Sequence, residues 1–292
     1  MQEGCEVFTK KVGTKLLDSG ENKVYNEGQK TKARKIMKTN YHTHTVRCNH
    51  AQGTDREYVE AAIEKGVEEL GFSDHSPYIF KDGHTSSFRM SLAAYDDYYA
   101  SLSALREEFK DQITLYIGLE MEYYRDDFDA TLAFVKKHPI DYLILGQHFI
   151  DGEPGCAPNT AGSDDEGRLV KYVDRVIEAM GRGVYSYVAH PDVLNFTGDE
   201  EIYRREVRRL CKASLESETP LEINLLGIRD LRRYPNPVFW EEAGKLGCHV
   251  ILGCDAHGPR TVSDDVSAAK AEEMIEKYGL VREEKLRFKF KS

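Results

Sequence analysis

The chain has 292 residues, 40% of them hydrophobic, which is enough to bury a large core within a single domain. Its formal net charge of −10 is uneven, because residues 1–38 carry +4 and the remaining residues carry −14. An acidic body lacks the basic surface that nucleic-acid binding needs, and no apolar run reaches the length of a membrane span.

The six cysteines form neither a paired framework nor a C-x-x-C motif, which is typical of reduced thiols in a cytosolic protein. The amino terminus has lysines but no apolar run behind them, so it does not resemble a secretory signal. We therefore expect a soluble cytoplasmic protein without nucleic-acid or membrane partners. No feature of the sequence predicts an oligomeric state.

Residues 1–36 are rich in Lys, Gly, Asn and Glu, and we expect a weakly structured extension there. Residues 37–292 form the expected folded domain. Its first strand, KTNYHTH, is followed by a helix in TDREYVEAAIEKG. Thr54 is the expected N-cap of that helix, Glu57 completes a capping box, and Gly66 ends the helix.

Strands and helices continue to alternate along the rest of the chain. Six further strands are predicted at residues 67–75, 113–120, 141–148, 184–190, 220–225 and 249–257. Helices are predicted at residues 90–110, 126–138, 166–182, 199–217, 236–247 and 263–278, before a basic tail. This order indicates an α/β fold with a parallel sheet, either closed as a barrel of seven βα units or open and doubly wound.

Metal-binding residue types stand at the carboxyl ends of nearly all the predicted strands. In NYHTHT, His42 and His44 are two positions apart, so both imidazoles point to the same side of a strand. The later strands end in Asp74 and His75, Glu120, His148, His190, and Asp255 with His257, whereas the sixth offers only Asn224. Because strand ends of an α/β barrel share one face, we expect these side chains to form one site.

Imidazoles combined with carboxylates, rather than thiolates, suit Zn, Mn, Fe or related divalent ions. Glu120 is the natural bridge between two ions, since a carboxylate has two oxygens to share. His50 follows the first strand by a short loop and is placed to curl back over the site. Asp74 is expected either to hydrogen-bond a ligand or to donate a proton, the alternative being an ordinary loop hydrogen bond. Cys48 is a further possible zinc ligand.

An open site with several metal ions lowers the pKa of a bound water and binds the charged oxygens of a phosphate ester. With these residues in view, the chain resembles the PHP (polymerase and histidinol phosphatase) family, and within it the histidinol-phosphatase branch. The motifs that carry the resemblance are, in order, NYHTHTVRCNH, GFSDHSP, IGLEMEYY, ILGQHF, YVAHPD, LEIN and LGCDAH. They cover about residues 37–260.

The resemblance implies a distorted (β/α)7 barrel that holds three divalent metal ions at the C-terminal ends of its strands. The ligands it implies are His42, His44, His50, His75, Glu120, His148, His190, Asp255 and His257. The implied reaction is hydrolysis of L-histidinol phosphate to L-histidinol and phosphate, a step of histidine biosynthesis. In that reaction a metal-bridging hydroxide attacks phosphorus in line.

Arginine matches a phosphate group through two parallel hydrogen bonds, so arginines near the strand ends are candidates for binding the substrate. Arg47 lies close to His44 in the sequence, and Arg89 lies in the loop after the second strand. Both are predicted to contact the small phosphorylated substrate. Further candidates, after the sixth strand, are Arg229, Arg232 and Arg233.

Three other functions fit parts of the pattern. A PHP phosphoesterase acting on nucleotides or other small phosphate esters keeps the same metal site, although the acidic body disfavours long polymers. An amidohydrolase also begins with H-x-H, but it ends on a lone Asp and needs a strand-end Lys that this chain lacks. A metal-holding scaffold without turnover is the interpretation in which the chain is not an enzyme.

Overall fold

The alternation of short apolar strands with helices produces one parallel sheet in this computed structural model, which describes residues 37–153 and 156–291. The extension predicted for residues 1–36 lies outside the described residues. The strands are β1 (Thr39–Asn40), β2 (Glu69–Phe72), β3 (Thr114–Glu120), β4 (Tyr142–Leu145), β5 (Tyr185–Val188), β6 (Leu221–Asn224), β7 (His249–Gly253) and β8 (Val281–Arg282). They pair in chain order, so each neighbour in sequence is a neighbour in the sheet.

All seven predicted strands are confirmed, each falling within its predicted range. Strands β4, β5 and β6 are buried at every position, as expected where helices cover the outside of a parallel sheet. The eighth strand, β8, was not expected, because two residues in a basic tail carry no periodic signal. It pairs with the first residues of β7.

The sheet curls until its first and seventh strands meet. A parallel bridge joins Thr43, after β1, to Ala256, after β7. The His44 amide donates to the Ala256 carbonyl at 2.9 Å, and the Ala256 amide donates to the His42 carbonyl at 3.1 Å. The distorted barrel expected from the sequence is therefore closed at the carboxyl ends of β1 and β7.

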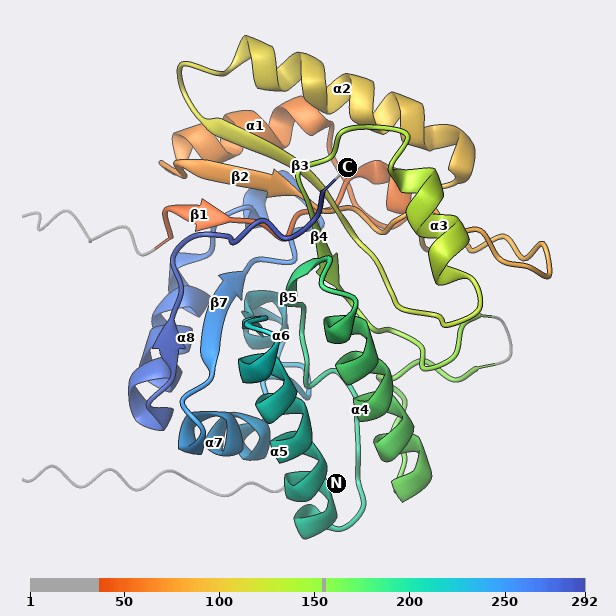
Figure 1. Ribbon diagram of the computed structural model, residues 1–292. Coiled ribbons are helices and arrows are strands. Elements are labelled where there is room, and N and C mark those ends of the chain that lie inside the picture. Colours follow the sequence, from red (N-terminus) through yellow and green to blue (C-terminus); the bar gives the residue numbers. More distant parts are fainter. Residues whose placement is uncertain (1–36, 154–155, 292) are drawn as a thin grey trace, which may run out of the picture. The chain divides into compact units, whose positions relative to one another are not determined.

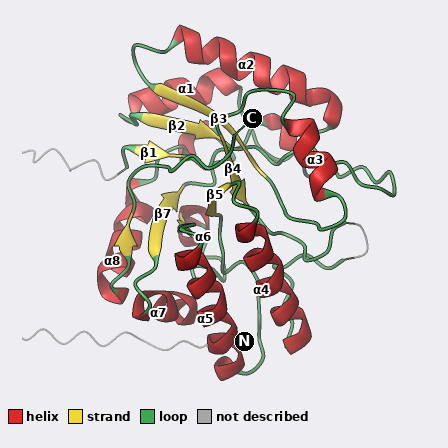
Figure 2. Ribbon diagram, in the orientation of Figure 1, coloured by secondary structure: helices red, strands yellow, loops and turns green. Residues whose placement is uncertain are grey.

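Helices surround the curled sheet, as Figures 1 and 2 show. They are α1 (Asp55–Glu64), α2 (Tyr95–Glu108), α3 (Phe128–Val135), α4 (Glu166–Gly181), α5 (Glu200–Glu216), α6 (Leu225–Arg229), α7 (Pro237–Lys245) and α8 (Asp265–Tyr278). Single 3-10 turns occur at η1 (Val46–Cys48), η2 (Leu92–Ala94) and η3 (Pro259–Thr261). Within the described residues, no helix has both the length and the apolar character needed to cross a membrane.

Local signals account for the ends of α1. Thr54 and Glu57 form the predicted capping box, in which each side chain accepts a hydrogen bond from the other residue's backbone amide. Gly66 has φ of 70°, a left-handed conformation that suits glycine at the end of a helix. Helix α6 was not predicted, because it begins directly after β6 with no intervening loop.

Below the strand ends lies a separate cluster of buried apolar side chains that includes three tyrosines. This cluster consists of Tyr41, Tyr142, Ile144, Tyr187, Ala189, Ile251 and Leu286. The Tyr142 hydroxyl donates to the backbone carbonyls of Tyr41 and Phe72, at 2.8 and 3.1 Å. The apolar floor leaves the carboxyl ends of the strands as the place where polar side chains gather.

Candidate metal centre

Glu120, the last residue of β3, lies at the centre of the predicted ligands and is fully buried. Five imidazoles reach within 3.6 Å of its carboxylate oxygens, those of His42, His44, His75, His148 and His190. The shortest contacts are 2.9 Å, from His75 Nδ1 to Oε2 and from His190 Nε2 to Oε1. The strand ends thus converge on one carboxylate, and the ligand role of these residues stays a prediction.

The other predicted ligands adjoin this group. Asp255 Oδ1 lies 3.1 Å from His44 Nε2 and 3.6 Å from His42 Nε2. His50 does curl back over the site, because its Nε2 lies 3.0 Å from Nε2 of His257. The loop that carries His50 is held by a 2.8 Å contact between its Nδ1 and the Cys48 carbonyl.

Four groups of three side chains have ligand atoms within 4.8 Å of one another and together contain all nine predicted ligands. The groups are His42–His190–Asp255, His42–His44–Glu120, His75–Glu120–His148 and His50–His75–His257. A fifth group joins Cys48 to His44 and His257. The structure therefore brings the whole predicted ligand set together, and it leaves Cys48 within reach of it.

Buried polar atoms at the centre support a cation there. His42 Nε2, His44 Nε2 and Glu120 Oε2 are buried and make no hydrogen bond, since the 2.9 Å contact of Glu120 Oε2 with His75 Nδ1 does not have hydrogen-bond geometry. A buried polar atom left unpaired costs about 1–3 kcal/mol, and here three of them lie together. Imidazole nitrogens and carboxylate oxygens are ligands of divalent zinc and related ions, so the residues present fit such ions.

The charges in the centre shift the pKa values of its members in opposite directions. Burial lowers the pKa of His42, but the negative charges of Glu222, Asp255 and Glu120 outweigh it and raise this pKa well above its ordinary value. Burial raises the pKa of Glu120, yet the neighbouring imidazoles hold it well below its usual range. The carboxylate is thus kept ionised, which is the form that binds a metal.

Two carboxylates that sequence analysis missed hold ligand imidazoles in place. Glu222, in β6, lies 2.7 Å from His42 Nδ1 and accepts the His190 backbone amide at 2.9 Å. Glu122 lies 2.8 Å from His148 Nδ1. A carboxylate on the second ring nitrogen fixes the orientation of a ligating histidine. Their spacing in the sequence is the signal that could have identified them. Glu122 is two positions after Glu120, and Glu222 is two positions before Asn224.

Asp74 occupies a comparable position next to His44. It is fully buried, and its Oδ1 lies 3.4 Å from His44 Nδ1 and accepts the His75 amide at 2.9 Å. Its other oxygen accepts the Thr45 hydroxyl. This arrangement favours the predicted hydrogen bond to a ligand over proton donation to a substrate.

Arg47 and Arg89, the predicted substrate contacts, are engaged within the protein. The Arg89 guanidinium, 2% exposed, binds Glu122 through Nη1 at 2.7 Å and Nη2 at 3.0 Å, and it also binds Glu153. Arg47 pairs with Asp55 at 2.9 Å and Asp97 at 2.7 Å. Neither lines the cavity described below. Their contact with a substrate stays a prediction, and it is one that this geometry does not favour.

Backbone conformation also aims two of the ligands. His190 has φ of 29° and Asp255 has φ of 47°. Residues other than glycine rarely adopt such left-handed backbone conformations, which cost about 1–3 kcal/mol and cluster at functional sites. Each residue is the second after the end of its strand, β5 or β7, and the left-handed turn there points the His190 side chain toward Glu120 and the Asp255 side chain toward His42.

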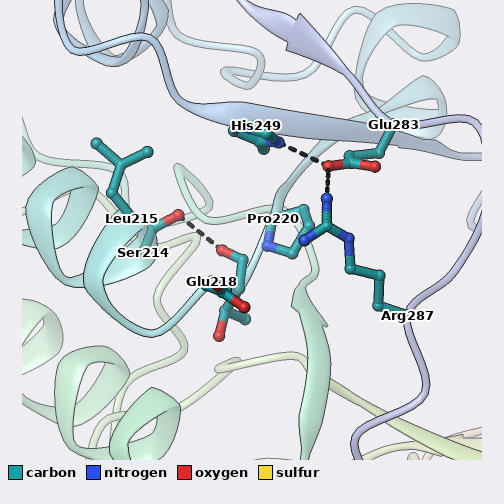
Figure 3. Close-up of a pocket in the computed structure, with 8 residues that line it drawn as sticks. Ser214, Leu215, Glu218, Pro220, His249, Glu283 and Arg287 are labelled. Carbon is teal, nitrogen blue, oxygen red and sulfur yellow. Dashed lines mark hydrogen bonds and ion pairs between the residues drawn. The ribbon is translucent and has the colours of Figure 1, made fainter.

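A cavity of about 720 Å³ opens above the ligands. Ligand side chains form one part of its lining, and Arg229, Asp230, Arg232 and Tyr234 form another. A smaller cavity of about 200 Å³ lies near the amino ends of β6 and β7. Figure 3 shows that His249 and Arg287 both point to Glu283 there. Both contacts are ion pairs with Glu283, and none of the predicted ligands lines this cavity, so the larger cavity is the candidate site.

Comparison with known proteins agrees with this geometry. A PHP domain is recognised over residues 40–225. The chain is 31% identical to the histidinol-phosphatase of Bacillus subtilis over 256 residues, which cover 76% of this chain and 94% of that protein. It is 30% identical to the histidinol-phosphatase of Lactococcus lactis, covering 84% and 92% of the two chains. A probable histidinol-phosphatase of Deinococcus radiodurans is 28% identical, covering 76% and 86%.

A solved structure has the same fold. The crystal structure of histidinol phosphate phosphatase from Lactococcus lactis, in complex with zinc, L-histidinol and phosphate, matches with a TM-score of 0.67. The match covers 86% of this chain and 98% of that one at 24% sequence identity.

Proposed function

The chain belongs to the PHP family, and we propose that it is a histidinol-phosphatase, a hydrolase that converts L-histidinol phosphate to L-histidinol and phosphate. The curated relatives of that name align with three quarters or more of the chain. The observation that carries the proposal is the set of buried, unpaired ligand atoms around Glu120, which lies beneath an open cavity.

Three divalent ions, of zinc, manganese or iron, are proposed for this centre. Glu120 and the eight other predicted ligands would hold these ions. Such ions lower the pKa of a bound water and neutralise charge on the phosphoryl oxygens of an ester. The protein's own part is to hold the imidazoles in one orientation, which Glu222, Glu122 and Asp74 do through the second ring nitrogens.

Arg229 is the residue that we propose for binding the phosphate. It is the last residue of α6 and lines the cavity. Its Nη1 is buried and has no hydrogen-bond partner, and it lies 3.9 Å from Oδ2 of Asp264. An unpaired guanidinium N–H on a residue that lines the cavity favours an anionic ligand, because a phosphate oxygen would satisfy it.

Elemental analysis of the purified protein, followed by assays on a panel of phosphate monoesters, tests this function. We expect close to three divalent ions per chain and the highest kcat/KM on histidinol phosphate. Asp255→Asn should lower the activity by more than the roughly 10- to 100-fold that follows removal of a residue hydrogen-bonded to a metal ligand. Asp111→Asn, which removes the same charge from an exposed turn, is the matched control.

Two results would contradict the proposal in different ways. Faster turnover of nucleotides or another phosphate ester than of histidinol phosphate would favour the alternative, a PHP phosphoesterase that acts on those esters. If the purified protein retains no metal, the proposed metal-dependent mechanism is wrong. The proposal also includes a cytoplasmic location, which the five free cysteines of the described residues favour.

A further inference from the structure

One wall of the cavity is built by α6 and the residues that follow it. The side chain of Asn224, the N-cap of α6, donates to Glu222 Oε2 at 3.0 Å and to Asp255 Oδ2 at 3.1 Å. Asn224 also accepts the Gly227 amide at 3.0 Å. The metal centre and this short helix are therefore held together by one side chain, which fixes the position of the helix end relative to the ligands.

Asp230, the residue after α6, is the one carboxylate among the described lining residues that is not a predicted metal ligand. Three other carboxylates near the centre, those of Asp74, Glu122 and Glu222, are fully buried behind ligand imidazoles and do not line the cavity. The Asp230 side chain is 44% exposed, so a molecule in the cavity can reach it.

Asp230 forms a charged pair with the proposed phosphate-binding residue. Arg229 Nε donates to Asp230 Oδ1 at 3.2 Å, while Arg232 Nη2 lies 3.8 Å from Oδ2. A carboxylate accepts about four hydrogen bonds, so these contacts leave it able to accept more. The wall thus presents a cation and an anion side by side.

Histidinol phosphate has the same arrangement of charges. Its phosphorylated carbon is bonded directly to the carbon that carries the ammonium group, so the two charges lie a few bonds apart. A phosphate held by Arg229 would bring that ammonium group close to Asp230. The adjacent residues of the wall are therefore complementary to the adjacent charges of the substrate.

We propose that Asp230 binds the ammonium group of the substrate and so selects phosphate esters with an amine on the neighbouring carbon. This assignment rests on the proposed function, because it takes the metal centre as the place where the phosphate is cleaved. It identifies Asp230 as a specificity-determining residue, distinct from the ligands and from the residues that orient them.

The test compares Asp230→Asn with the unmodified protein on two substrates, histidinol phosphate and its des-amino analogue, 3-(imidazol-4-yl)propyl phosphate. A hydrogen bond between charged groups contributes about 1.5–3 kcal/mol, so kcat/KM for histidinol phosphate should fall roughly 10- to 100-fold. The kcat/KM of the variant for the analogue should stay within about threefold of that of the unmodified protein, since the analogue has no ammonium group for Asp230 to bind. The inhibition constant should rise for histidinol and stay unchanged for inorganic phosphate.

Asp111→Asn is the control for the lost charge, and the metal content of each variant shows whether the centre is intact. Equal losses on both substrates, or no loss on either, would overturn the assignment of Asp230 while leaving the proposed function standing. If the unmodified protein does not hydrolyse histidinol phosphate, the proposed function fails first and this inference fails with it.

Discussion

At the scale of single residues, the centre depends on how each histidine divides its two nitrogens. His42 and His148 each present Nε2 to Glu120, at 3.6 Å, and Nδ1 to a second carboxylate. A metal ion takes the place of the proton on Nε2, so a ligating imidazole has one N–H, and a carboxylate on Nδ1 keeps that hydrogen there. The lone pair of Nε2 is then directed at the centre, which is the arrangement that a metal ion requires.

Glu222→Gln should weaken metal binding without changing the ligands. The amide keeps the size of the side chain but removes the charge that orients His42 and that accepts the His190 amide. We expect roughly 10- to 100-fold lower zinc affinity, measured by competition with a chromophoric chelator. Glu216→Gln, at the exposed end of α5, is the control. Equal affinities of the Glu222 variant and the unmodified protein would show that Glu222 does not orient a ligand.

At the scale of elements, the strand ends approach one another more closely than most side chains allow. A Cβ placed on Gly146, the residue after β4, would lie 1.9 Å from Oε1 of Glu120. A Cβ on Gly253, the last residue of β7, would lie 1.8 Å from Oε1 of Glu222. Glycine at these positions leaves the volume that the central carboxylates occupy.

Gly146→Ala should therefore displace Glu120 and lower the number of bound ions. The expected result is loss of at least one ion per chain by elemental analysis, together with a loss of activity. Gly181→Ala is the matched control, because a Cβ there meets nothing within 4 Å. Full metal content in the Gly146 variant would mean that Glu120 can shift without cost.

Helices α5 and α7 are joined by a charged contact that should respond to pH. Glu242 is buried, yet Arg208, Lys245 and Arg204 surround it and hold its pKa at about 2. Because this folded-state pKa lies below the unfolded value of about 4.3, its contribution to stability is present above pH 4.3 and is lost as pH falls toward 2. Burial opposes the shift, so the arginines and the lysine must outweigh it.

Glu242→Gln should remove this pH-dependent part of the stability. We expect about 1–2 kcal/mol of destabilisation at pH 7 from urea unfolding, because the hydrogen bonds lose their charge assistance. The difference from the unmodified protein should shrink as pH falls through 4 toward 2. A difference that stays constant over this range would point to packing rather than charge.

At the scale of the whole described domain, the carboxyl-terminal tail completes the barrel. The Thr39 hydroxyl, in β1, donates to the Glu284 carbonyl at 2.8 Å, so the residues after β8 reach the first strand. Leu286, 8% exposed, packs with Tyr41 and Tyr142 inside the barrel. The tail thus closes the end of the barrel that is opposite the metal centre.

Leu286→Ala should lower the free energy of unfolding by about 2–4 kcal/mol, since it leaves a cavity among rigid aromatic rings. Urea unfolding measures the change, and Val266→Ala, at a position that is 72% exposed, is the control. Metal content at 25 °C should be unchanged, because the ligands lie at the other end of the strands. Loss of less than 1 kcal/mol would mean that the tail is not part of the core.

The sequence predicted the α/β alternation, the parallel sheet and a site at the strand ends, because these follow from local periodicity and chain order. It did not predict β8 or α6, which are too short for a periodic signal and form through contacts with β7 and Asn224. It also did not predict the pairing of Arg89 with Glu122 and Glu153, two residues that are 33 and 64 positions away.

The residue types that end the strands, and therefore the chemistry of the candidate metal centre, are properties of the sequence by itself. Only the tertiary structure decided which nitrogen of each histidine faces Glu120 and which carboxylate holds the other nitrogen. It also decided that Asp230 rather than Arg89 lines the cavity. The reason is physical: His42 and Glu222 are 180 residues apart, and their contact exists only once the strands lie side by side.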